Sequence, residues 1–161
     1  MNEVFRQIPL YRFLMFCNNS SLEKTVLDCG AGGNQPPLSL FLESGYAVTG
    51  LEYNSVFHMN KADIKKSLSE MKRVLKKDGL LFVNFLTTKD HRFKVGEDQS
   101  NYQYIQIENG IPTIHSYFDE KETDKLFKDM KILYKEDRVL ERIYEGYVIR
   151  QGFIDYIVQK I

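Results

Sequence analysis

A glycine-rich turn directly after a short apolar run is the feature that most limits how this chain can fold. Residues 25–29 read Thr-Val-Leu-Asp-Cys and predict a buried strand, and residues 30–33 read Gly-Ala-Gly-Gly. Glycines let a backbone turn tightly and approach a ligand closely. The start of the helix that follows has free N–H groups. The pattern therefore predicts an α/β unit whose first turn faces a bound molecule.

An acidic residue ends the second predicted strand, which covers residues 47–52. Glu52 lies 20 positions beyond Gly32, close to the spacing of about 20 residues that is typical of nucleotide-type cofactor sites. A carboxylate at this place can accept hydrogen bonds from both hydroxyls of a ribose. Together, the glycine turn and Glu52 indicate a cofactor that contains adenosine.

The details of the turn separate a methyl donor from a dinucleotide. The dehydrogenase fingerprint G-x-G-x-x-G needs a last glycine where Gln35 stands, which disfavours a nicotinamide cofactor. The acid Asp28 before the first glycine resembles motif I of the Rossmann-like, class I methyltransferases that use S-adenosylmethionine. The resemblance implies that Asp28 and the glycine backbone hold the amino-acid part of this cofactor. It implies a cofactor site made of Asp28, Gly30, Ala31, Gly32, Glu52 and Tyr53.

Other segments follow the same family in the same order. Residues 71–83 resemble its late helix, turn and fifth strand, and residues 54–59 resemble the segment after its fourth strand. Asn60 predicts a cap for the helix that carries Ile64 and Leu68 and that ends at the Asp-Gly pair 78–79. Asn-Gly at 109–110 predicts a hairpin, and residues 131–144 and 147–158 predict two long antiparallel strands around Glu-Gly.

The resemblance also implies that a central part of the fold is missing. The family places a helix, a strand, another helix and a fourth strand between the positions of Glu52 and Asn54, or roughly fifty to sixty residues. A contracted sheet could fill the vacancy, with residues 47–53 in its centre. Two chains could instead associate and cover the exposed edges, which is the expectation here because an unpaired central edge is a liability.

His58 is the candidate catalytic residue, because it is the only histidine near the expected cofactor turn. An imidazole has a pKa suited to a general base. The alternative is a local hydrogen bond ahead of the helix, since methyl transfer often needs little more than alignment of the nucleophile with the methyl group. Cys17, Cys29, His91 and His115 show no metal-ligand spacing, so no metal is expected.

Chain length and net charge limit the number of domains and the classes of partner. A chain of 161 residues predicts one domain over residues 1–161. Its 22 basic and 22 acidic side chains balance, which argues against a nucleic-acid partner. No segment reaches the roughly 20 apolar residues of a membrane span, so we expect no membrane partner and a cytoplasmic protein.

The expected fold is α/β: a Rossmann-like methyltransferase domain with a mostly parallel sheet and antiparallel C-terminal strands, lacking about two central strand-helix units. The resemblance implies an S-adenosylmethionine-dependent methyltransferase whose partners are a small-molecule methyl acceptor and, through the exposed edges, a second copy in a homodimer. The alternative is a non-catalytic binding or dimerisation module derived from that family. The missing segment favours the alternative, and the intact turn and Glu52 favour the enzyme.

Overall fold

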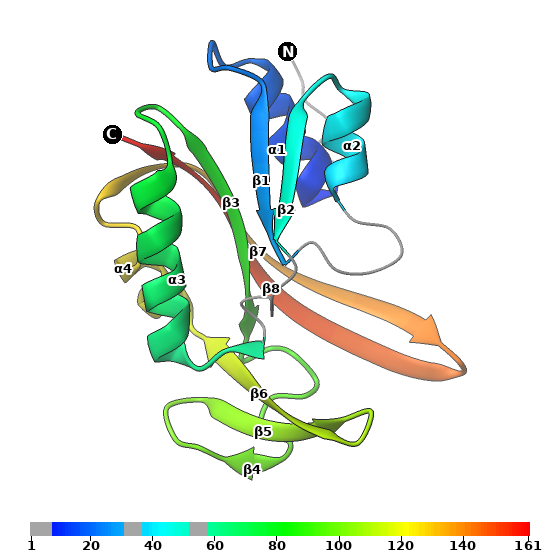
Figure 1. The fold of residues 1–161 in the computed structure, drawn as a ribbon. Helices are drawn as coiled ribbons and strands as arrows, with labels where there is room; N and C mark the ends of the chain where they lie inside the picture. Colours follow the sequence, from blue (N-terminus) through cyan, green and yellow to red (C-terminus); the bar gives the residue numbers. More distant parts are fainter. Residues whose placement is uncertain (1–7, 31–36, 52–57) are drawn as a thin grey trace. The chain divides into compact units, whose positions relative to one another are not determined.

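The chain divides into two compact units in the computed structural model, which describes residues 8–30, 37–51 and 58–161. The first unit is Met1–Ser55 and the second is Val56–Ile161 (Figure 1). No helix of the described residues is both long enough and apolar enough to cross a bilayer.

The first unit is a β-α-β unit preceded by a helix. Helix α1 covers Pro9–Asn18 and helix α2 covers Leu38–Glu43. The strands β1 (Thr25–Cys29) and β2 (Ala47–Leu51) pair in parallel from Thr25↔Ala47 to Cys29↔Leu51. Proline fixes φ and lacks an N–H, so it suits the first helical turn, and α1 begins at Pro9. The strand predicted over residues 25–29 coincides with β1, and the strand predicted over residues 47–52 coincides with β2 as far as Leu51, where the described residues of this segment end.

Aromatic rings form the core of this unit. The Phe13 and Phe41 ring centroids are 5.8 Å apart, and those of Phe41 and Tyr46 are 5.5 Å apart in an edge-on contact. Tyr46 also donates a hydrogen bond of 3.0 Å from its hydroxyl to Asn18 Oδ1. These contacts hold the two helices against the start of β2.

The second unit contains a six-stranded sheet and two helices. Its helices are α3 (Lys61–Val74) and α4 (Glu120–Lys125). Its strands are β3 (Leu80–Thr87), β4 (Glu97–Asp98), β5 (Gln103–Glu108), β6 (Ile111–Phe118), β7 (Met130–Tyr144) and β8 (Tyr147–Lys160). The strand order is β4-β5-β6-β3-β8-β7.

This sheet is mixed, and most of its pairs are antiparallel. Strand β3 pairs with β8 in antiparallel register from Leu80↔Gln159 to Leu86↔Phe153, but with β6 in parallel only at Leu86↔Tyr117 and Thr87↔Phe118. The expectation of a mostly parallel sheet is therefore wrong for this unit. Two-residue turns can join only antiparallel neighbours, and such turns connect both β5 to β6 and β7 to β8.

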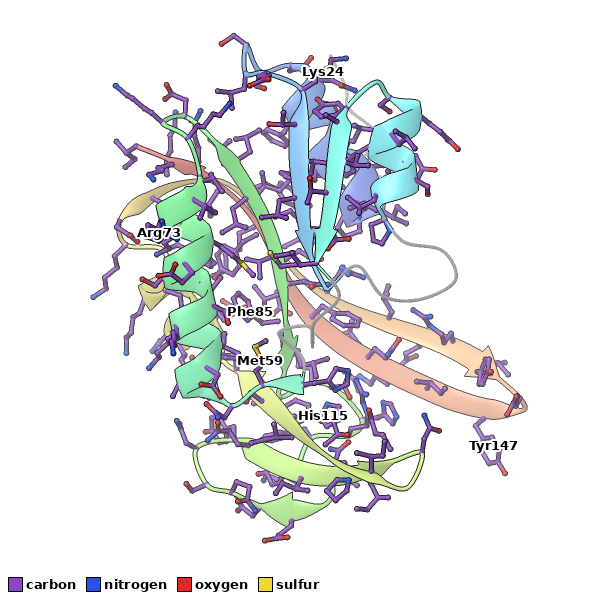
Figure 2. The ribbon with its side chains drawn as sticks, in the orientation of Figure 1. Lys24, Met59, Arg73, Phe85, His115 and Tyr147 are labelled. Carbon is purple, nitrogen blue, oxygen red and sulfur yellow. The ribbon has the colours of Figure 1, made fainter. Side chains whose placement is uncertain are left out.

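Helix α3 packs its apolar face on the sheet. Asn60 Oδ1 accepts a hydrogen bond of 2.8 Å from the Asp63 N–H, as the predicted cap requires. Ile64 and Leu68 are buried against β3, whose Phe85 points toward the helix (Figure 2). The cluster contains Ile64, Leu68, Val83, Phe85, Phe118, Phe127, Met130, Ile154, Tyr156 and Val158.

Candidate functional site

The structure describes only part of the predicted cofactor site. Ala31, Gly32, Glu52 and Tyr53 lie outside the described residues. Gly30 has a φ of 112°, a conformation that side chains rarely allow, so glycine is required at this position. Its N–H donates a hydrogen bond of 2.9 Å to the Leu51 carbonyl oxygen, which ties the ends of β1 and β2 together.

Asp28 is the polar side chain at this end of β1. Its Oδ2 atom is buried and has no hydrogen-bond partner among the described residues. Burial raises the pKa of its carboxyl group above the usual value. A buried carboxylate oxygen without a partner is costly, and a cation or an N–H donor beside it would remove that cost. The position is thus suited to a ligand that presents a positive charge.

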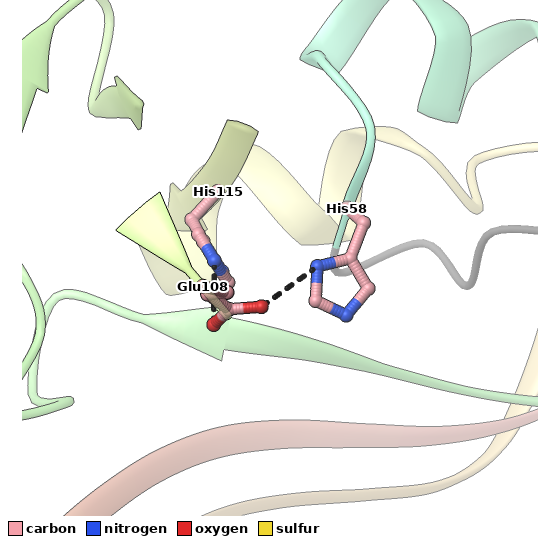
Figure 3. Close-up of side chains that lie close together, drawn as sticks. All are labelled: His58, Glu108 and His115. Atoms are coloured by element: carbon pink, nitrogen blue, oxygen red, sulfur yellow. Dashed lines mark ion pairs between the residues drawn. The ribbon is translucent and has the colours of Figure 1, made fainter. Parts of the chain in front are cut away.

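A second group of polar side chains lies wholly within the second unit (Figure 3). His58 precedes α3, Glu108 ends β5, and His115 is in the middle of β6. His115 Nε2 lies 3.0 Å from Glu108 Oε1, and His58 Nδ1 lies 3.8 Å from Glu108 Oε2. The two imidazole centroids are 5.1 Å apart in an edge-on contact. The carboxylate therefore lies between two imidazoles, a cluster that we call the His-Glu-His group.

Two hydrogen bonds hold His58 in this place. The Ser116 hydroxyl on β6 donates to the Met59 carbonyl oxygen at 2.7 Å. The Lys61 N–H donates to Gln103 Oε1 on β5, also at 2.7 Å. Figure 2 shows Met59 and His115 close to one another. The segment that carries His58 is thereby fixed to the same hairpin that carries Glu108 and His115.

An arginine adds a positive charge to the group. Arg92 Nη1 lies 3.6 Å from Glu108 Oε1, and its Nε donates to the buried Asp90 at 3.1 Å. Burial lowers the pKa of His115, and the charges of Arg92 and His58 lower it further, against an opposite effect of Glu108. A lowered pKa keeps this imidazole neutral, with one nitrogen lone pair available.

Sequence reasoning identified His58 but missed its partners. The hairpin turn pairs Glu108 with Ile111, so residues 104, 106 and 108 share a face with 111, 113 and 115. That register places Glu108 and His115 on one face of the hairpin, and it follows from the Asn-Gly signal alone. The approach of His58 to that face depends on tertiary packing, which no local pattern contains.

Comparison with known proteins gives no match in sequence but several in structure. No protein-family model matches the chain, and no curated protein matches its sequence. A structure of S-adenosylmethionine-dependent methyltransferase from Methanosarcina mazei is 21% identical, with a TM-score of 0.66, and the match covers 91% of this chain and 97% of that chain.

Two further methyltransferase structures are also similar to this chain. The 1,6-didemethyltoxoflavin N1-methyltransferase of Burkholderia thailandensis, solved with 1,6-didemethyltoxoflavin and S-adenosylhomocysteine, is 13% identical with a TM-score of 0.64 and covers 94% of this chain and 76% of that chain. An S-adenosylmethionine-dependent methyltransferase from Anabaena variabilis is 10% identical with a TM-score of 0.63, over 94% and 83% of the two chains. The internal shortening stays a prediction, because none of these values locates a deletion. Over more than nine-tenths of its length, the chain has the fold of the class I S-adenosylmethionine-dependent methyltransferases.

Proposed function

We propose that the chain is a methyltransferase that uses S-adenosylmethionine and acts on a small molecule. Two findings support this: the shared fold, and the Burkholderia thailandensis structure that contains both a small-molecule ligand and S-adenosylhomocysteine. The observation that carries the proposal is the buried Oδ2 of Asp28, which lacks a partner among the described residues and lies beside the glycine turn. The ammonium group of the cofactor's methionine part would satisfy this oxygen.

In the proposed site, the turn after β1 holds one part of the cofactor, and the residues after β2 hold the other part. Asp28, Gly30, Ala31 and Gly32 would hold the methionine part, Glu52 would accept the ribose hydroxyls, and Tyr53 would line the pocket. When bound, S-adenosylmethionine supplies an electrophilic methyl group on a sulfonium. The contribution of the chain is orientation, since aligning two reactants removes much of the entropic barrier to a bimolecular reaction.

His58 is the proposed base for an acceptor that must lose a proton. Its Nδ1 faces the Glu108 carboxylate at 3.8 Å, so the imidazolium that forms would be stabilised by a negative charge. The side chain is 34% exposed, which leaves room for an acceptor. A His58→Ala variant should then lose turnover rate, while its affinity for S-adenosylmethionine stays unchanged.

The test is isothermal titration of the full chain with S-adenosylmethionine and S-adenosylhomocysteine. We expect micromolar binding by the native chain and an affinity about tenfold or more lower in Asp28→Asn, because a hydrogen bond to a charged group contributes about 1.5–3 kcal/mol. Glu43→Gln, an exposed change on α2, serves as the matched control and should leave the affinity unchanged.

Two results would count against this proposal. Equal affinities of the native chain and Asp28→Asn would remove Asp28 from the cofactor site. No binding by folded protein would favour the non-catalytic binding or dimerisation module instead. Circular dichroism of each variant would show that the fold is retained.

A further inference from the structure

We propose that His58, Glu108 and His115 form a binding site for one divalent transition-metal ion, with zinc as the reference ion. All three residues belong to the second unit, so the inference does not rest on the proposed use of S-adenosylmethionine. The site is made by the β5–β6 hairpin and the turn before α3. In the sequence, Glu108 comes 50 residues after His58, and His115 comes 7 residues after Glu108.

The three side chains place their ligand atoms close enough together to bind one ion. One atom from each of the three side chains can be chosen so that all lie within 4.8 Å of one another. Zinc binds imidazole nitrogen at about 2.0–2.1 Å and carboxylate oxygen at about 2.0–2.2 Å, so neighbouring ligands of one ion are separated by roughly 3–3.5 Å. The distance from His115 Nε2 to Glu108 Oε1 is 3.0 Å and that from His58 Nδ1 to the other carboxylate oxygen, Oε2, is 3.8 Å, and these values bracket that separation. Small side-chain rotations would bring the three atoms onto one ion.

Three ring nitrogens of the two imidazoles lack hydrogen-bond partners among the described residues. His115 is 0% exposed, yet neither of its ring nitrogens has a hydrogen-bond partner among the described residues, and the same holds for His58 Nδ1. His115 Nε2 is 3.0 Å from the Glu108 carboxylate, but the pair is not aligned as a hydrogen bond. Buried imidazoles of ordinary cores are satisfied by donors or acceptors. A metal ion would use the lone pairs of both imidazoles and the carboxylate at once.

The fold holds the three ligand residues near one another before any ion binds. His115 and Glu108 belong to a paired β-hairpin, and His58 is fixed to that hairpin through Met59 and Lys61. A preformed set of ligands loses little conformational entropy on binding, so more of the coordination energy appears as affinity. Figure 3 shows the carboxylate between the two rings.

The donor set indicates the class of ion. Two imidazoles and one carboxylate suit zinc, cobalt and nickel better than magnesium or calcium, which prefer oxygen ligands. Three protein ligands leave a position open for water or for an oxygen or nitrogen atom of a small molecule. A metal on His58 Nδ1 takes the single lone pair of the neutral ring and leaves Nε2 as an N–H, so His58 would not act as a base in the metal-loaded chain.

The local charge is compatible with a cation. Arg92 opposes binding through its contact of 3.6 Å with Glu108 Oε1, but Asp90 offsets its charge at 3.1 Å. The carboxylates of Asp90 and Glu108 outnumber the single guanidinium of Arg92. The group therefore keeps a net negative charge toward an incoming ion.

The test uses tag-free, metal-depleted full chain titrated with zinc against a chromophoric chelator, without S-adenosylmethionine. We expect one zinc per chain and, in Glu108→Gln and in His58→Ala, an affinity lower by more than the roughly 10- to 100-fold that loss of an outer partner of a metal ligand costs. Cobalt bound in place of zinc should give visible absorption bands that the two variants lose. Two controls should bind zinc as the native chain does: His91→Ala, which removes the third histidine, and the double variant Cys17→Ser, Cys29→Ser, which removes both thiols.

Several results would overturn the inference. The inference fails if the folded native chain does not bind zinc, or if Glu108→Gln binds zinc as tightly as the native chain. It also fails if the cysteine double variant loses zinc binding. Failure here is separable from failure of the proposed function, because S-adenosylhomocysteine titration of chelator-treated protein reports on the first unit alone.

Discussion

The Glu108 carboxylate contacts three nitrogen-bearing side chains of the second unit. Its Oε1 lies 3.0 Å from the His115 ring and 3.6 Å from the Arg92 guanidinium, and its Oε2 faces His58. An arginine at this distance competes with any cation for the same carboxylate. The strength of the proposed metal site is therefore set by Arg92 as well as by its ligands.

We predict that Arg92→Gln binds zinc several-fold more tightly than the native chain. Removal of one positive charge close to the ion lowers the electrostatic cost of binding, and the Arg92 backbone N–H still donates to Asp90 Oδ1 at 3.0 Å. Competition with a chromophoric chelator measures the change. Lys94→Gln removes an exposed charge two positions away and should have little effect. Weaker binding in Arg92→Gln would contradict the model of the site.

Asp124 should make the stability of the folded chain depend on pH. Hydrogen bonds from Lys135 at 2.9 Å and from the Tyr156 hydroxyl at 2.6 Å lower the pKa of this carboxyl group. A group whose pKa is lower in the folded state stabilises the fold above its unfolded pKa of about 3.9, and this contribution is lost as the pH falls through the folded value.

Asp124→Asn should therefore unfold more easily at neutral pH, and the difference from the native chain should shrink below about pH 4. Because Asp124 is 47% exposed, water screens the pair and the loss should stay under about 1 kcal/mol. Urea unfolding at a series of pH values measures it. A difference that grows in acid would contradict the assignment.

At the scale of elements, local sequence signals predicted most of the second unit. The Asn109-Gly110 turn has φ values of 52° and 79°, and Glu145-Gly146 has 49° and 83°, so both residues of each turn adopt the left-handed conformation that two-residue hairpins need. Helix α3 ends at Val74, earlier than predicted, since residues 75–79 form a separate turn with Asp78 at a φ of 61°. A side chain at Gly79 would lie 2.7 Å from the Lys76 carbonyl oxygen, so glycine is required there.

The parts that sequence could not predict depend on contacts between distant segments. The parallel contact of β3 with β6 covers two residue pairs, and the approach of His58 to the hairpin rests on two hydrogen bonds. Neither contact produces a periodic pattern or a characteristic residue pair in the local sequence. The strand end and turn at Asp28 and Gly30 could be predicted because consecutive residues determine them, and their role in a cofactor site stays a prediction.

The cap of α3 gives a prediction at this scale. Asn60→Ala removes the acceptor of the Asp63 N–H and should lower the free energy of unfolding by about 1 kcal/mol. Urea denaturation gives this value from the shift of the midpoint at constant slope. Lys66→Ala, an exposed change in the middle of α3, should stay within about 0.5 kcal/mol of the native chain. Equal losses in the two variants would show that the cap contributes nothing specific.

At the scale of the whole molecule, the β7–β8 hairpin has an apolar tip. Ile143, Tyr144, Tyr147 and Val148 surround the turn and are 78%, 59%, 75% and 71% exposed. Tyr147 points outward from the tip (Figure 2). Clustered bulky apolar side chains on a surface typically mark contact sites, and a chain with zero net charge has no overall repulsion to oppose self-association.

We predict that the chain forms a homodimer that depends on this hairpin tip. Light scattering coupled to size-exclusion chromatography should give twice the mass of one chain, and Ile143→Lys should shift the protein to monomer because a buried, unpaired charge at an interface is costly. Val74→Lys replaces another exposed apolar residue, on α3, with the same charge and should remain dimeric. A native chain that stays monomeric at high concentration would contradict the prediction of a homodimer. A dimer that persists in Ile143→Lys would instead place the interface elsewhere, which makes the strand edges the next surface to test.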